Sequence, residues 1–251
     1  MPETRFDILS QFDPITLEEM KAVKLMNRID EKYLLTLDQL QRLFEFALKD
    51  YRAQEIDGTR IASYHTRYYD TPRREMYLIH LTGKKVREKI RVRTYIGSDL
   101  TFLEVKNKNN KGRTKKKRIE ITDPDNLDLP FVHEFLGKHA WYALGDIELS
   151  LENRFSRVTL VNRARTERLT IDLGVWFHNY KTDNTYQLTK VAIVELKRDG
   201  RVYSPIRQIL RDMRIKPQGF SKYCMGCVFT DPLIKHNRFK ERKLKVLKLN
   251  R

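Results

Sequence analysis

Charged residues alternate with apolar or neutral ones along three consecutive segments in the middle of the chain. These segments run from Lys89 to Tyr95, from Phe102 to Lys108 and from Lys116 to Ile121. Successive side chains of a β-strand point to opposite faces, so this two-residue period predicts strands that each have one charged face. Most of the charges are positive, and such crowding is unfavourable unless an anion balances it. The pattern therefore predicts a basic sheet face that binds a polyanion.

The rest of the chain shows further strand patterns and a few helical ones. Strands are predicted over 28–35, 64–70, 146–160, 167–173 and 189–197, and helices over 16–25, 37–48, 131–138 and 205–213. The connection over 107–113 contains only basic residues, Asn and Gly, which is typical of a hairpin loop. These elements predict an α+β protein built on an antiparallel sheet.

The polar faces of these strands allow two arrangements. About eight strands that all turn their polar faces inward can close into a barrel around a charged lumen, which also removes the sheet edges. An open sheet whose apolar face is covered by helices fits the same periodicity. The residues alone leave this choice open.

Composition narrows the choice of partner. The 251 residues include 50 Lys and Arg against 33 Asp and Glu, a net charge of +17, which indicates nucleic acid, an acidic membrane, a nucleotide or polyphosphate. Specific nucleic-acid binding is disfavoured because Phe and Tyr do not recur between the basic positions as a stacking platform. No repeat or linker divides the chain, so we expect one domain over 1–251, with a basic tail over 235–251.

Other classes of protein are disfavoured by what the sequence lacks. It has no run of about twenty apolar residues to span a membrane and no secretory signal at its start. Its two cysteines, Cys224 and Cys227, exclude a disulfide scaffold and fit a cytoplasmic protein. Their C-x-x-C spacing has only His236 nearby, so we interpret them as packed side chains rather than as a metal or redox site.

Eight short motifs occur in the order found in a known family. They are Arg28-x-Asp30-x-Lys32-Tyr33, Tyr68 to Thr71, Ile90 to Tyr95, Phe102-Leu103-Glu104-x-Lys106, Asn153-Arg154, Arg168 to Asp172, Val194-Glu195-x-Lys197 and Ser221-Lys222-Tyr223. Together, over about 27–226, they resemble the catalytic VTC (vacuolar transporter chaperone) domain. That family belongs to the triphosphate tunnel metalloenzymes and is related to the CYTH phosphatases. The resemblance implies an eight-stranded antiparallel β-barrel tunnel with peripheral helices that makes inorganic polyphosphate from ATP.

The resemblance also implies a set of site residues. The catalytic candidates are Lys32, Arg91, Arg93, Lys106, Arg154 and Glu195, of which Glu195 would hold Mn²⁺ or Mg²⁺. Further phosphate-binding candidates are Arg28, Lys89, Lys108, Lys116, Arg118, Arg168, Lys197, Ser221 and Lys222. Glu195 could instead form a structural ion pair, and Asp172 is expected to orient a neighbouring arginine. The sequence departs from many family members at Glu152, where they have Tyr.

The first strand bears on the type of reaction. The related phosphatases resemble Glu-x-Glu-x-Lys there, whereas this chain has Arg28, Asp30 and Lys32. Replacing a carboxylate by Arg favours phosphate holding over water activation, so we predict a polymerase that uses ATP and polyphosphate. The alternatives are a triphosphatase acting on triphosphate, nucleotides or RNA 5′ ends, and a non-catalytic polyanion-binding module. The SPX domain and membrane segment of the eukaryotic complexes have no counterpart in this sequence, so the resemblance does not extend to sensing or translocation, and the question of a separate membrane partner stays open.

Overall fold

One antiparallel sheet forms the centre of the molecule. The computed structural model describes residues 6–21 and 28–251. Eight strands follow one another across the sheet in the order β2 (Arg28–Thr36), β11 (Val191–Asp199), β9 (Glu167–Asn179), β8 (Glu148–Asn162), β4 (Ala62–Asp70), β5 (Arg87–Ile96), β6 (Leu100–Lys108) and β7 (Thr114–Glu120). The predicted α+β fold with an eight-stranded antiparallel sheet is confirmed.

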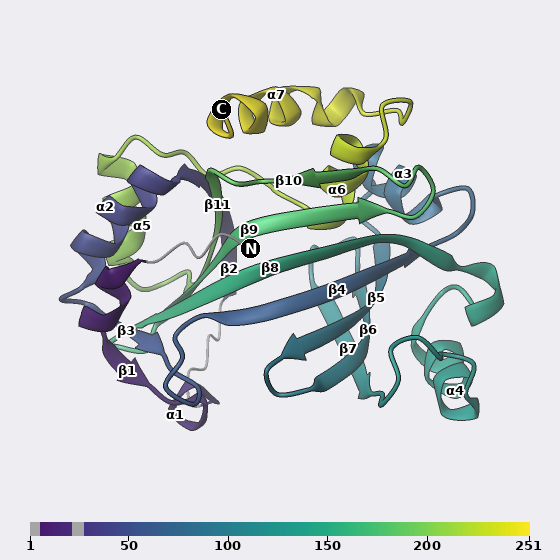
Figure 1. Cartoon of the computed structure of the whole chain (residues 1–251), viewed down its shortest axis with the longest axis horizontal. Helices are drawn as coiled ribbons and strands as arrows, with labels where there is room; N and C mark the ends of the chain where they lie inside the picture. Colours follow the sequence, from purple (N-terminus) through teal and green to yellow (C-terminus); the bar gives the residue numbers. More distant parts are fainter. Residues whose placement is uncertain (1–5, 22–27) are drawn as a thin grey trace.

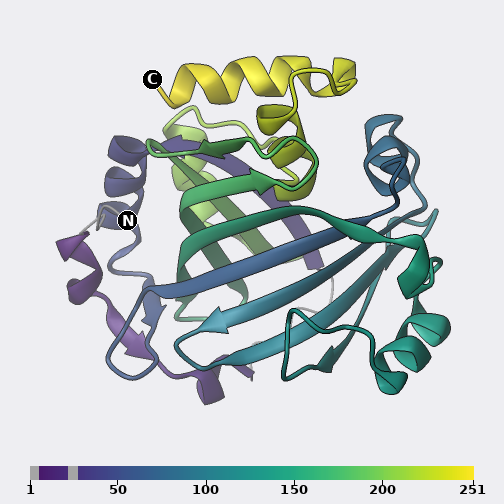
Figure 2. The ribbon, with the colours of Figure 1, turned by 45° about the vertical axis from the view of Figure 1, so that its right-hand side comes forward.

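The sheet is strongly curved. Figure 2 shows its β2 and β11 end lying behind the blue and teal strands β4 and β5. Among the described residues no pairing joins β2 to β7, so the barrel is not strictly closed. Three short strands extend the sheet: β1 (Asp13–Ile15) pairs with β3 (Tyr51–Gln54), β3 pairs with β8, and β10 (Thr185–Gln187) pairs with β9.

Helices cover the outer, convex face of the sheet at its two ends. The helix α2 (Leu37–Ala47), the helix α5 (Pro205–Asp212) and the 3-10 turn η1 (Asp7–Gln11) pack on β2, β11, β9 and β8. The helix α4 (Pro130–His139) packs on β5, β6 and β7. Between these two groups, Figure 1 shows no helix crossing β4, β8 and β9. Thr36 begins α2 by accepting a hydrogen bond from the backbone N–H of Gln39, in a capping box.

The concave, inner face is polar in one part and apolar in the other. The apolar part carries residues such as Leu151, Phe155 and Phe177 and is covered by the helix α6 (Lys222–Thr230). The helices α3 (Glu75–Leu81) and α7 (Lys240–Leu249) lie against α6, with α7 above it in Figure 1. The remaining elements are α1 (Leu17–Lys21), η2 (Leu144–Asp146) and η3 (Asn237–Phe239).

One buried carboxylate joins α3 and α6 to the sheet. Asp70, at the end of β4, accepts hydrogen bonds from the backbone N–H groups of Met76 and Tyr77, both at 2.9 Å. The phenol of Tyr223 on α6 donates to the same carboxylate at 2.5 Å. Because these donors come from separate elements, Asp70 fixes where α6 begins relative to the sheet.

Several elements differ from the sequence-based expectation. The strand β9 continues beyond residue 173 to Asn179, because Gly174 has a φ of +59° and a bulge between β8 and β9 absorbs the irregularity. The basic tail, expected as low-complexity sequence, forms α7. The expected helix over 16–25 is described over Leu17–Lys21, and the rest of its expected range lies outside the described part of the chain. In the part that the structure describes, no helix is long and apolar enough to span a membrane.

The close packing of α6 on the inner face gives a direct test. A methyl group at Gly226 would lie 2.4 Å from Leu151 Cδ2 and 2.7 Å from Phe177 Cδ1. We expect Gly226→Ala to lower the free energy of unfolding by about 1–3 kcal/mol through overpacking. Gly137→Ala on α4 is the control, since nothing lies within 4 Å of that position. It should raise the stability by up to about 1 kcal/mol. Urea unfolding of both variants measures this, and equal effects would contradict the placement of α6.

Candidate functional site

Charged side chains from the strands β2, β11, β9, β8, β5, β6 and β7 meet on the polar part of the inner face. Strand register places Lys32 opposite Glu195, Arg157 opposite Asp172, and Lys106 opposite Lys116. With Lys222 from the start of α6, these residues form what we call the inner cluster. Its members are Lys32, Arg91, Arg93, Glu104, Lys106, Lys116, Arg157, Asp172, Glu195, Lys197 and Lys222.

Glu104 organises the side of the inner cluster formed by β5, β6 and β7. Its fully buried carboxylate accepts hydrogen bonds from Arg91, at 2.7 Å from Nε and 2.5 Å from Nη2. Lys116 forms an ion pair with the other oxygen. Burial alone would raise the pKa of Glu104, but Arg91 and Arg93 outweigh it and lower the pKa to about 2. Glu104 is therefore a carboxylate at neutral pH and holds two cations in place.

Among residues 6–21 and 28–251, no carboxylate forms an ion pair with Lys106. Arg91, burial and Arg93 together lower the pKa of its ammonium group to about 5. Arg93 is affected in the same direction, since burial, Arg91 and Arg157 lower its pKa to about 10. Positive charge therefore exceeds negative charge on this side of the inner cluster. An anion bound between these groups would relieve their repulsion and restore the charge on Lys106.

Asp172 organises the other side of the inner cluster. Arg157 donates to its two oxygens from Nε at 2.6 Å and from Nη2 at 3.0 Å, and Lys222 also donates to it. Burial disfavours the charged form of Arg157, but Asp172 outweighs burial and raises the pKa of the guanidinium. Burial lowers the pKa of Lys222 to about 8 in spite of Asp172. Asp172 orients an arginine, as expected, and that arginine is Arg157.

Glu195 lies between two lysines on neighbouring positions of the same face. Lys197 donates to it at 2.7 Å, and Lys32 Nζ lies 3.7 Å from its other oxygen. Burial opposes ionisation, but Lys32 and Lys197 hold the pKa of Glu195 well below its usual range. Lys32 also donates to the carbonyl of Phe220 at 3.0 Å. The lysine thereby ties β2 to the segment that leads into α6.

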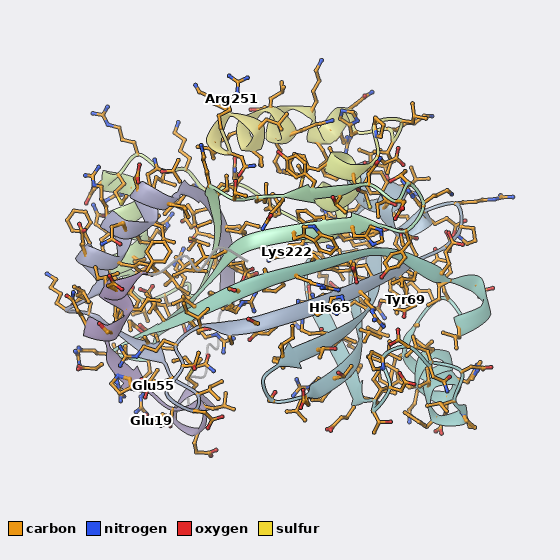
Figure 3. The ribbon with its side chains drawn as sticks, viewed as in Figure 1. Glu19, Glu55, His65, Tyr69, Lys222 and Arg251 are labelled. Atoms are coloured by element: carbon orange, nitrogen blue, oxygen red, sulfur yellow. The ribbon has the colours of Figure 1, made fainter. Side chains whose placement is uncertain are left out.

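The first residues of α6 complete the inner cluster. The Ser221 hydroxyl caps the helix by accepting from the backbone N–H of Cys224, at 3.3 Å, and it also accepts from Lys89 Nζ at 3.0 Å. Figure 3 labels Lys222, whose side chain reaches Asp172 on β9 and lies 4.5 Å from the ring centre of Phe155 on β8. The helix start thus brings a serine and a lysine to the same place as the strand cations.

Three other predicted residues lie at the margin of the inner cluster, and the position of a fourth side chain is not described. Lys108 faces Thr114 in register, and Arg168 faces Lys197. Arg118 is on the exposed edge strand β7, with its guanidinium 4.3 Å from the ring centre of Phe102. The strand position of Arg28 is described, but its side chain lies outside the described part of the structure.

Arg154 does not join the inner cluster, and this corrects the sequence-based expectation. It lies opposite His65 and Trp176 on the outer face, where its guanidinium is 5.4 Å from the Trp176 ring centre and half exposed. Figure 3 labels His65 on β4 in the same region. Glu152 is also on the outer face and accepts a hydrogen bond from His65 at 2.6 Å.

Sequence reasoning missed two inner-face residues. Arg157 shares the odd-numbered face of β8 with Asn153 and Phe155, so strict two-residue alternation was the signal that could have selected it over Arg154. Tyr68 of β4 also points to the inner face of the sheet. Burial raises the pKa of its phenol, but Arg91, Arg93 and Lys222 outweigh burial and lower it. Both residues are positioned to contact an anion in the inner cluster.

The side chains of the inner cluster could hold a divalent metal only as one carboxylate acting together with substrate phosphates. Among the described residues no group of three or more His, Cys, Asp or Glu side chains could hold a metal ion. Mg²⁺ and Mn²⁺ are commonly held by one or two carboxylates together with substrate phosphates. Glu195, which is ionised and on the inner face, could serve as that carboxylate.

Solved structures share the fold at low sequence identity. A putative adenylate cyclase from Bacillus halodurans has a TM-score of 0.50 and 12% identity, with 78% of this chain and 96% of that chain covered. A putative adenylyl cyclase from Hippeastrum, described as having a dominant triphosphatase activity, has a TM-score of 0.50 and 15% identity. It covers 84% of this chain over 100% of its own length. No curated protein matches the sequence.

The family itself is shown by a match over most of the sequence. The model of the VTC domain matches residues 27–143 and 146–230 of the 251 residues. The motifs of β2, β5, β6, β9, β11 and the start of α6 fall within this range and supply most of the inner cluster. The chain therefore belongs to the VTC family.

Proposed function

We propose that this protein is a polyphosphate polymerase that transfers the γ-phosphoryl group of ATP to the end of an inorganic polyphosphate chain. The observation that carries the proposal is the excess of positive charge around Lys106, which burial and Arg91 make costly without an anion. Three phosphates in a row supply negative charge at several neighbouring positions, as the rows of cations on β5 and β6 require. Membership of the VTC family supports the same substrate class.

The chain's own residues would act by binding and orientation. Arg91, Arg93 and Arg157 present planar forks that suit phosphate oxygens, and Lys106 and Lys222 act as point charges. A terminal phosphate oxygen of the polyphosphate chain attacks the γ-phosphorus, the new P–O bond forms, and the bond to the bridging oxygen breaks as ADP leaves. Cations around the transferring group stabilise the charge that moves onto the leaving oxygen.

The carboxylates of the inner cluster favour transfer to phosphate over transfer to water. A general base must accept a proton, and its efficiency falls as its pKa falls far below the operating pH. The pKa values of Glu104, Asp172 and Glu195 are all lowered by neighbouring cations. A phosphate acceptor is already anionic and needs no such base. The lack of an effective general base therefore slows hydrolysis more than it slows polymerisation.

Mn²⁺ or Mg²⁺ would act together with Glu195. Glu195 would hold the ion together with substrate phosphates, and the ion would supply positive charge that neutralises part of the phosphate charge. Lys32 and Lys197 keep Glu195 ionised, which suits it to this role.

A triphosphatase is the second candidate function. The Hippeastrum protein, which shares the fold, is described as having a dominant triphosphatase activity. The same cations would bind a triphosphate equally well, so the two functions differ only in the acceptor of the phosphoryl group.

The two arginines of β8 test the site. We expect Arg157→Ala to lower turnover of ATP at least tenfold, since charge-assisted hydrogen bonds to phosphate contribute about 1.5–3 kcal/mol each. Arg154→Ala removes the same charge from the outer face and should stay within about twofold of the unchanged protein. Steady-state ADP release, with thermal unfolding to check folding, gives the comparison. A larger loss in Arg154→Ala than in Arg157→Ala would show that the inner face is not the site.

Glu195→Gln separates binding from chemistry. If Glu195 holds the metal, the variant should lose turnover but keep its affinity for tripolyphosphate within a few fold, because the cationic side chains remain. Calorimetry with and without Mn²⁺ measures the affinity. Loss of tripolyphosphate binding in the absence of metal would mark Glu195 as a structural partner of Lys32 and Lys197.

The products formed from ATP distinguish the candidate functions. A polymerase should release ADP with little matching orthophosphate, leave the balance in acid-labile chains, and run faster with a pyrophosphate or short polyphosphate primer. Separate assays of ADP and orthophosphate, together with a polyphosphate gel, follow this. Orthophosphate equal to ADP from the first turnover would establish the triphosphatase. Release of neither product would indicate a non-catalytic binding module.

A further inference from the structure

A second group of cations lies where α3, α6 and α7 meet the sheet. It surrounds His80 of α3, whose Nδ1 lies 3.1 Å from the thiol of Cys224 on α6. Burial and then Lys89, Arg87, Arg242 and Lys32 lower the pKa of His80 to about 2. The imidazole is therefore neutral, and the charge here comes from the cations. Lys32 belongs to the inner cluster, and we call the other three, Arg87, Lys89 and Arg242, together with His80, the basic corner: Lys89 Nζ lies 3.0 Å from the hydroxyl of Ser221, two residues after the Gly219 that Arg242 approaches.

The basic corner lacks the carboxylates that balance the inner cluster. Glu104, Asp172 and Glu195 each pair with two cations in the inner cluster. In contrast, Arg87, Lys89 and Arg242 form no salt bridge with any carboxylate in residues 6–21 and 28–251. Partly buried cations without an ion-pair partner are unfavourable, and at Arg242 the neighbouring Glu241 does not offset burial, so the corner is suited to an external anion.

Arg242 brings α7 into contact with the segment that precedes α6. Its Nη2 lies 3.5 Å from the position of a Cβ on Gly219, and its guanidinium is 5.7 Å from the ring centre of Phe239 on its own chain segment. The next residue, Phe220, holds Lys32 through its carbonyl. Burial lowers the pKa of Arg242, which shows that its charge is partly removed from water.

The basic corner continues the row of cations on the inner face. Arg87, Lys89, Arg91 and Arg93 occupy alternate positions of β5 and so point to one side of the sheet. At about 3.3 Å per residue, Arg87 lies roughly 13 Å along the strand from Arg91. A triphosphate bound at Arg91 and Lys106 leaves this end of the row unused, whereas a longer chain of phosphates would extend along it.

We propose that the basic corner is a second phosphate subsite, which holds the phosphates of a polyphosphate chain beyond those bound in the inner cluster. The inference rests on the proposed function, because it takes the inner cluster as the place where the reacting phosphates bind. Arg87 and Arg242 supply forked donors, and Lys89 connects the corner to Ser221 at the start of α6. A free orthophosphate is the other source of the same chemical group.

Binding measurements on variants of Arg242 test the proposal. Affinities of tripolyphosphate, medium-chain polyphosphate and orthophosphate are measured by calorimetry at fixed salt for the unchanged protein, Arg242→Ala, Arg87→Ala and Lys245→Ala. Lys245 is an exposed cation on the same helix, so its variant controls for the loss of one charge. Thermal unfolding checks that every variant is folded.

The expected result is a loss that depends on chain length. Arg242→Ala and Arg87→Ala should weaken binding of the medium chain by at least about fivefold and change tripolyphosphate binding less than about twofold. Lys245→Ala should change neither by more than about twofold. Retention of these affinities in Arg242→Ala and Arg87→Ala, or an equal loss for both chain lengths, would overturn the second subsite.

The remaining outcomes separate this inference from the proposed function. If both arginine variants lose orthophosphate binding but keep the affinity for the medium chain, the occupant is free phosphate and the polyphosphate subsite is refuted. If the unchanged protein binds the medium chain through Arg242 but does not bind tripolyphosphate, the basic corner still binds phosphate chains, but not as an extension of a site for the reacting phosphates, and the proposed function fails.

Discussion

Repulsion between like charges on the inner face is the constraint on which the rest of the structure depends. Arg91, Arg93 and Lys106 lie on adjacent strands, and the sheet fixes their spacing regardless of the cost. The lowered pKa of Lys106 reflects that cost. The buried carboxylates of Glu104 and Asp172 and the half-buried carboxylate of Glu195 reduce the repulsion and do not cancel it, so the face keeps its affinity for an anion. Water would screen these charges, but burial keeps much of it away.

The helix α6 links this electrostatic arrangement to the hydrophobic core. Its apolar residues cover the part of the inner face that carries Leu151 and Phe177, and Gly226 allows the close approach. Its first turn delivers Ser221 and Lys222 to the cations of the strands. Asp70 sets the position of this turn through Tyr223. A carboxylate outside the inner cluster thus determines the geometry of the site, because it determines where α6 starts.

The outer face of the sheet serves packing, whereas the polar part of the inner face carries the groups that would bind substrate. At its ends the outer face is apolar and covered by α2, α5 and α4. The inner face concentrates the charge, and its carboxylates hold cations rather than protons. Such a site binds and orients phosphate groups well and activates water poorly. This balance is the physical reason to favour phosphate as the acceptor in a VTC-family protein whose chain carries Arg28, Asp30 and Lys32 on its first long strand.

The sequence by itself determined the strands, their charged face and the family. Two-residue alternation is a local property of β-strands, so the pattern of residues was enough to assign Arg91, Arg93, Lys106 and Glu195 to the charged faces of their own strands, and the family resemblance implied that they share one site. Local pattern could not determine which strands would be neighbours, so the pairing of Asp172 with Arg157 across β8 and β9 was not predicted. For the same reason Arg154 was assigned to the site although it points outward. Only the tertiary structure showed that α6 covers the apolar part of the inner face and that α7 brings Arg242 to the segment before α6, since contacts between distant segments depend on packing of the whole chain.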